Sequence, residues 1–148
     1  MDLKEKIDAD IKAAMLARDK VRLETLRSIK SAFMIEATKE AGATVDDDLA
    51  TKVIMKLHKQ RKEAADIYEQ QGREDLHKEE MDQAAILEEY LPKQLSPEEL
   101  KARLTTIIAA VGASGPQDMG KVMGKASAEL AGLSDGKTIS NMVKEMLS

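Results

Sequence analysis

Apolar residues recur along this chain at the spacing of amphipathic α-helices. In residues 2–17, Leu3, Ile7, Ile11 and Met15 follow one another at intervals of four, which places them in one narrow stripe. The same kind of periodicity predicts a helix over 19–41, a third helix that ends at Gln71, and further helices over 73–90, 97–111, 117–131 and 135–147. We therefore expect an all-α fold of seven helices without strands.

Capping residues set the limits of these helices. Thr44 is followed by three aspartates at 46–48, which predicts a capped helix start with acids at the positive end of the helix dipole. Gly42 and Gly72 predict the ends of the second and third helices.

One boundary between domains is expected after the fourth helix. Pro92 cannot continue an intact helix, and the segment Ser96-Pro97-Glu98-Glu99 is a full capping box with proline at the first helical position. The sequence therefore predicts an N-terminal domain of about four helices over 1–92 and a small three-helix bundle over 96–148.

Composition narrows the class of protein. The chain has no cysteine and three aromatic residues, which excludes disulfides and thiolate metal sites and argues against β-sandwiches and binding by base stacking. It has no apolar run long enough for a membrane span, and its charged start does not resemble a signal peptide. We expect a soluble cytoplasmic protein that binds neither membranes nor DNA.

The net charge of −4 is unevenly distributed. Residues 1–41 carry nine basic and eight acidic side chains, residues 42–95 carry eight and thirteen, and residues 96–148 carry six and six. The acidic excess therefore belongs to the middle of the chain.

Several basic residues fall inside the apolar arcs of their predicted helices. Arg22 and Lys30 do so in the second helix, and Arg61 does so in the third. A charge in such an arc is costly unless it is paired, so these residues either meet an acid such as Glu80 or line a basic groove for an anionic ligand. The candidates for that groove, between the second and third helices, are Arg18, Arg22, Arg27, Lys30 and Arg61.

The most distinctive stretch is Asp118-Met-Gly-Lys-Val-Met-Gly-Lys-Ala-Ser127. Gly120 and Gly124 lie one helical turn apart, and each costs a helix about 1 kcal/mol relative to alanine. Either a neighbouring helix packs closely against them, or a sugar–phosphate chain approaches their backbone. In the second case Lys121 and Lys125 would contact the phosphates.

No catalytic, metal or cofactor site is predicted. The run from Gly115 to Lys121 has the spacing of a phosphate-binding loop, but Val122 occupies the Ser/Thr position and no strand precedes it. His58 and His77 stand on different predicted helices without a metal-binding constellation, and are interpreted as ordinary surface histidines.

Three blocks of the chain resemble the YqeY-like family, which shares its C-terminal domain with the tail of GatB, the tRNA-contacting subunit of bacterial glutamyl/aspartyl-tRNA amidotransferase. They are Arg18-Asp-Lys-Val-Arg-Leu-Glu-Thr-Leu-Arg27, the segment from Lys59 to Tyr90-Leu-Pro92, and Asp118-Met-Gly-Lys-Val-Met-Gly124 with Asp135-Gly-Lys137. Gln83 departs from the family pattern, because the family is expected to have a second acidic residue at this position, three residues after Glu80.

The resemblance implies a two-part α fold and a non-catalytic accessory protein that binds or handles tRNA. Onto this chain it transfers only the Gly120, Lys121, Gly124 and Lys125 surface, as RNA-facing or packing residues. Two alternatives stay open: a helical adaptor for a translation-related protein, and an accessory subunit in carbon–nitrogen ligation with glutamine as amide donor. The amidotransferase catalytic parts have no counterpart among the matched residues.

Overall fold

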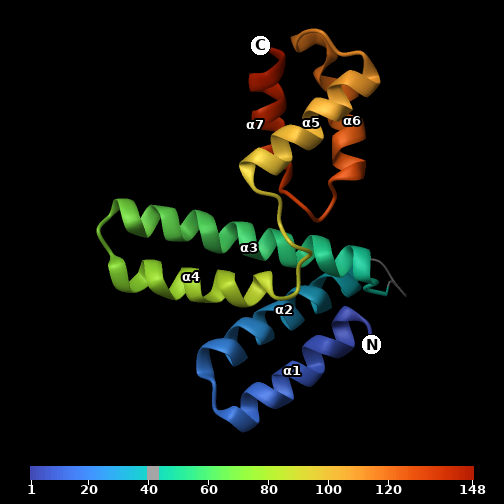
Figure 1. The fold of residues 1–148 in the computed structure, drawn as a ribbon. Helices are drawn as coiled ribbons and strands as arrows, with labels where there is room; N and C mark the ends of the chain where they lie inside the picture. Colours follow the sequence, from blue (N-terminus) through green and yellow to red (C-terminus); the bar gives the residue numbers. More distant parts are fainter. Residues whose placement is uncertain (40–43) are drawn as a thin grey trace. The chain divides into compact units, whose positions relative to one another are not determined.

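A computed structural model describes residues 1–39 and 44–148 of the chain. These residues form two compact units, 1–91 and 92–148, whose helices are labelled in Figure 1. They contain seven α-helices, one 3₁₀ turn and, within the described ranges, no strand. The predicted all-α class is confirmed. The helix end predicted at Gly42 lies outside the described residues.

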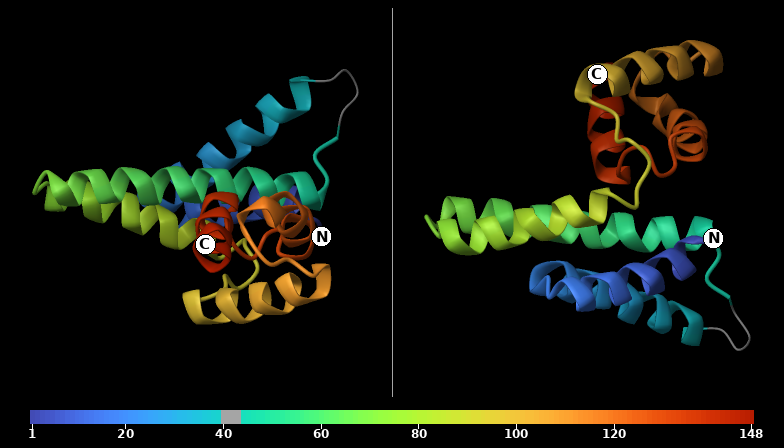
Figure 2. Two further views of the ribbon diagram at one scale, coloured as in Figure 1. Left: turned by 90° about the horizontal axis from the view of Figure 1, so that it is seen from above. Right: turned by 60° about the horizontal axis from the view of Figure 1, so that its bottom comes forward.

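The first unit consists of two helical hairpins. Helices α1 (Leu3–Ala17) and α2 (Lys20–Lys39) form one hairpin, and α3 (Asp47–Gln70) and α4 (Glu74–Glu88) form the other, whose helices lie side by side in every view (Figures 1 and 2). The core joins the two hairpins, because its buried members come from all four helices or the residues that follow them: Ile7, Ala14, Leu26, Ile29, Phe33, Ala50, Val53, Ile54, Leu87 and Tyr90.

The start of α3 differs from the prediction at the capping residue. Thr44 is not the cap; the Asp46 side chain accepts a hydrogen bond from the Leu49 amide at 2.9 Å, and Asp46 has the extended backbone of an N-cap. The neighbouring Asp47 accepts from the amide of Leu3 at 2.9 Å and so fastens the start of α1 to the start of α3. One aspartate therefore caps its own helix and the next caps another.

The apolar stripe of α1 leaves the core before it reaches its last member. Ile7 is 1% exposed, but Met15 is 52% exposed and Ala14 is buried in its place. A four-residue spacing drifts about 40° around a helix at each step, so Met15 has rotated away from the core direction that Ile7 defines. Met15 therefore belongs to the stripe that the spacing predicts but is not buried with Ile7.

Arg18 closes α1 in a left-handed conformation, with φ of 56° and ψ of 34°. Its amide donates to the carbonyls at the end of α1, and the Asp19 amide donates to the Ala14 carbonyl at 3.1 Å, as in a Schellman motif. Glycine usually occupies this position because a Cβ is strained there.

We therefore expect Arg18→Gly to stabilise the first unit by about 1 kcal/mol, since the left-handed strain disappears. Chemical denaturation monitored by circular dichroism measures this change. Arg18→Ala is the control, because it removes the side chain and keeps the strain. Equal stability of the two variants would contradict the argument.

The second unit is a three-helix bundle. Helix α5 (Pro97–Val111) is followed by the 3₁₀ turn η1 (Pro116–Asp118), α6 (Met119–Glu129) and α7 (Gly136–Leu147). Its own core contains nine buried side chains: Leu100, Leu104, Ile107, Val122, Ala126, Leu130, Ile139, Val143 and Leu147. Both bonds of the Ser96/Glu99 capping box are present, and the Ser96 backbone holds the pKa of Glu99 below its usual value.

The segment before α5 is also fastened to this bundle. The Leu95 amide donates to the Leu133 carbonyl at 2.9 Å, and the Gln94 side-chain amide donates to the Gly132 carbonyl at 2.8 Å. In the described part of the chain, no helix combines the length and hydropathy that a membrane crossing requires.

Candidate functional site

Gly120 and Gly124 lie on the exposed side of α6. Apart from the backbone of α6 itself, no atom of the described residues lies within 4 Å of the position that a Cβ would occupy at either glycine. Within residues 92–148, no other helix packs against the glycine pair, which was one of the two alternatives that the sequence left open. Val122 and Ala126 on the opposite side of α6, and Leu130 directly after the helix, are fully buried and hold the helix in place.

Lys121 and Lys125 are exposed beside the two glycines. The Lys125 ammonium lies 3.8 Å from a Glu129 carboxylate oxygen, and both side chains are about two-fifths exposed, so this pair contributes little. We call Gly120, Lys121, Gly124 and Lys125 the glycine–lysine face. It presents bare helical backbone next to two cations.

Arg22 is paired with an acid rather than available to a ligand. Its guanidinium donates to both Glu89 carboxylate oxygens, at 2.8 and 3.1 Å, and lies 3.4 Å from the Tyr90 hydroxyl. This hydrogen bonding raises the pKa of Arg22 and lowers that of Glu89. The pair joins α2 to the end of α4.

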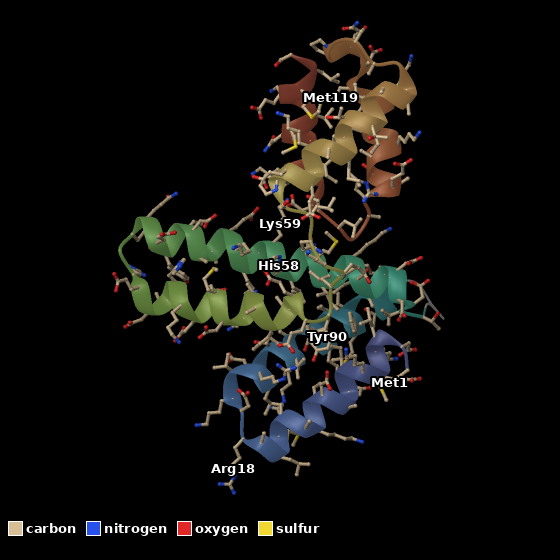
Figure 3. The ribbon with its side chains drawn as sticks, viewed as in Figure 1. Met1, Arg18, His58, Lys59, Tyr90 and Met119 are labelled. Atoms are coloured by element: carbon tan, nitrogen blue, oxygen red, sulfur yellow. The ribbon has the colours of Figure 1, made fainter. Side chains whose placement is uncertain are left out.

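Tyr90 is the centre of the same junction (Figure 3). Its ring is 6% exposed, its hydroxyl donates to Asp10 at 2.6 Å, and the Lys6 ammonium lies 5.4 Å from the ring centroid. Burial, followed by the bond to Asp10, raises the pKa of the tyrosine. We call Lys6, Asp10, Arg22, Glu89 and Tyr90 the tyrosine junction.

Arg61 lies on α3 and contacts side chains of α2 and α4. Its Nε donates to the Gln83 amide oxygen at 2.7 Å and its Nη2 donates to the Ser28 hydroxyl at 3.2 Å, while a Glu80 oxygen lies 3.8 Å from Nε. Arg61 therefore meets Glu80, but Gln83 takes the closer contact. The Glu80 Oε2 atom is buried and has no hydrogen-bond partner among the described residues.

The structure does not bring the five groove candidates together. Lys30 pairs with Asp8 of α1 at 2.8 Å, whereas Arg22 contacts α4 and Arg61 contacts α2 and α4. Arg18 and Arg27 are exposed, and Arg18 points away from the helices at the α1–α2 turn (Figure 3). Arg22, Lys30 and Arg61, the three cations in apolar arcs, therefore contact side chains of other helices.

The two histidines join α3 to α4, which corrects their interpretation as ordinary surface residues. His58 Nε2 lies 2.8 Å from a Glu88 oxygen, and His77 Nδ1 lies 2.8 Å from the Ala65 carbonyl oxygen. Both side chains are half-buried. Across residues 1–39 and 44–148, no group of three or more His, Asp or Glu side chains is arranged to hold a metal ion.

Sequence reasoning missed Asp10, Glu89 and Tyr90 as members of one cluster. Asp10 and Tyr90 are separated by 80 positions, and periodicity within single helices carries no information on such pairs. The available signal was the Tyr90-Leu-Pro92 block, in which a rare aromatic residue stands immediately before a predicted boundary.

Comparison with known proteins places the chain in a family. Residues 4–147 match the profile described as Yqey-like protein. The chain is 33% identical over 120 residues to "Altered inheritance of mitochondria protein 41, mitochondrial" of Kluyveromyces lactis, covering 78% of this chain and 64% of that one. It is 35% identical over 82 residues to the Meyerozyma guilliermondii protein of the same name, covering 55% and 42%.

A protein of the same name from Lachancea thermotolerans is 25% identical over 146 residues, covering 97% of this chain and 78% of the relative. The chain spans less than two thirds of the length of the first two relatives. All three are named as mitochondrial proteins, which overturns the expectation of a cytoplasmic location. The match over nearly all of its length shows that the chain belongs to the YqeY-like protein family.

Proposed function

We propose that the protein binds tRNA through the glycine–lysine face of α6 and catalyses no reaction of its own. The observation that carries this proposal is the open space above Gly120 and Gly124. An interior glycine such as Gly124 costs a helix about 1 kcal/mol, and no other helix of the second unit gains from the missing side chains. A partner that needs close access to the helix would account for them.

A sugar–phosphate backbone fits this surface. Two lysines one turn apart offer charges to successive phosphates, and the bare backbone between turns lets a polyanionic chain approach closely. RNA is favoured because A-form helices are recognised through shape and through sugar and phosphate contacts rather than by inserted side chains. The resemblance of this block to the tRNA-contacting tail of GatB points to the same ligand.

The charge of the chain does not oppose local binding. Residues 96–148 carry six basic and six acidic side chains, so an RNA phosphate at α6 meets no acidic excess within its own unit. Phosphate contacts supply most of the affinity for nucleic acids and make it dependent on salt. Binding is therefore expected to be weak, local and lost at high salt.

Replacing both glycines by alanine separates stability from binding. We expect Gly120→Ala combined with Gly124→Ala to stabilise the second unit by about 1–2 kcal/mol, because both sites are exposed and unobstructed but only Gly124 lies in the interior of α6. The same change is expected to weaken tRNA binding at least tenfold, since two methyl groups displace the backbone of the ligand. Thermal melts and filter binding with bulk tRNA at low salt measure the two effects.

Gly136→Ala is the matched control, because Gly136 is exposed, helical and unobstructed but lies at the start of α7. Lys121→Glu with Lys125→Glu tests the charges, and Lys144→Glu on α7 is its control. The proposal fails if wild-type protein retains no tRNA, or if the alanine pair and the glutamate pair bind as well as their controls.

A second candidate function is the docking of a protein partner by the first unit. An uncovered apolar strip on the first helix would favour it, and Leu16 and Met15 of α1 are 87% and 52% exposed. Helix α1 is therefore not fully packed within the described structure.

A further inference from the structure

A small apolar pocket lies between α1, α2 and the segment that leads into α3. Its floor is formed by Ile7 and Phe33, which are almost fully buried, and Met34 and Ala37 contribute to its walls. The cavity has a volume of about 60 Å³, several times the space that one water molecule needs. This is room for one aliphatic side chain.

The opening of the pocket is basic. Lys4 and Lys30 line it together with Asp8, which is paired to Lys30 at 2.8 Å, so the lining carries one positive charge in excess. Lys4 is exposed, and the Lys30 side chain is half exposed. A carboxylate at this opening would meet two ammonium groups, of which one is shared with Asp8.

Apolar surface continues beyond the pocket. Met34, which lines the pocket, is itself 61% exposed, although large apolar side chains are usually buried. A small acid that filled the pocket would leave this surface uncovered, whereas a chain that crosses it would cover both. Interfaces commonly combine one anchor side chain in a pocket with surrounding contacts of this kind.

We propose that this pocket docks a polypeptide partner in which an aliphatic side chain stands next to a carboxylate. The aliphatic side chain fills the space above Ile7 and Phe33, and the carboxylate contacts Lys4 and Lys30. The partner chain then lies over Met34. This interaction uses residues of the first unit only and does not depend on tRNA binding.

Methyl NMR of the full chain tests the proposal with a defined probe. The capped peptide acetyl-Asp-Leu-Leu-Asp-amide is expected to shift the Met34 methyl signal in a saturable way, and acetyl-Asn-Leu-Leu-Asn-amide is expected to bind at least threefold more weakly. Lys4→Gln is expected to weaken the acidic peptide about two- to fivefold, as for one exposed ion pair. Free 4-methylpentanoate serves as the small-acid arm.

Ala37→Leu fills the pocket from its own wall and is expected to abolish the peptide-induced shift while the protein stays folded. Ala85→Leu, at an exposed position of α4, is the matched control and is expected to bind like the wild type. The proposal is overturned if Ala37→Leu still binds the peptide, if the acidic and amide peptides bind equally, or if 4-methylpentanoate binds more tightly than the acidic peptide.

Discussion

Leu104→Ala is expected to remove most of the stability of the second unit while the stability of the first unit stays unchanged. Leu104 is fully buried in a core that shares no residue with the core of the first unit. A buried Leu→Ala substitution costs about 2–5 kcal/mol, and a unit of this size has a total stability of roughly 3–8 kcal/mol. The substitution therefore removes most of the stability of residues 92–148.

Amide NMR measures this result unit by unit. As urea is added, signals of residues 92–148 should collapse to the narrow range of an unfolded chain at a much lower urea concentration than in the wild type, and those of residues 1–39 should keep their wild-type transition. Leu104→Met is the control, because it conserves volume and usually costs less than 1.5 kcal/mol. Loss of both sets of signals together would show that the two cores depend on each other.

Tyr90→Ala is expected to destabilise the first unit by about 3–5 kcal/mol, the usual cost of removing a buried aromatic ring. Tyr90 is 6% exposed and contacts Asp10, Arg22 and Lys6. Tyr90→Phe keeps the ring and removes only the hydroxyl, so we expect it to cost about 1.5–3 kcal/mol near neutral pH, the range of a hydrogen bond to a charged acceptor. Urea denaturation gives both values.

The difference in stability between the wild type and Tyr90→Phe is expected to depend on pH. Burial raises the pKa of Tyr90 above that of a tyrosine in the unfolded chain, which is about 10. The stability that the neutral hydroxyl provides is therefore complete below pH 10 and decreases as the pH rises above it, by about 1.4 kcal/mol per unit. The advantage of wild type over Tyr90→Phe should shrink between pH 9 and pH 11, and a constant difference would contradict this assignment.

The helices were predictable because their signals are local. Ser96, Pro97 and Glu99 specify the start of α5 within four residues, and both capping bonds form. The structure differs from the simple pattern where two neighbouring residues could both cap a helix, or where the spacing of apolar residues turns the last one away from the core. Asp46 takes the cap that Thr44 was expected to provide, and Met15 turns away from the core at the end of α1.

The contacts of the candidate residues were less predictable, because they depend on the packing of distant helices. The position of Arg22 in an apolar arc indicated that it needs a partner, but nothing local indicated Glu89, which is 67 positions away. For Gly120 and Gly124 the sequence left helix packing and ligand access open. Only the positions of the other helices of the second unit exclude packing among them.

Many acidic side chains of this protein lie at helix starts, and this position reduces their repulsion of a polyanion such as RNA. Residues 42–95 hold the acidic excess, yet Asp46 caps α3, Asp47 binds the start of α1, and Asp48, Glu74 and Asp75 lie in first turns. Carboxylates at these positions offset the positive ends of helix dipoles. Near these helix starts, the electrostatic potential that an approaching phosphate experiences is therefore less negative than a count of side chains indicates. At physiological ionic strength, screening beyond about 8 Å leaves local lysines, rather than net charge, to govern encounter.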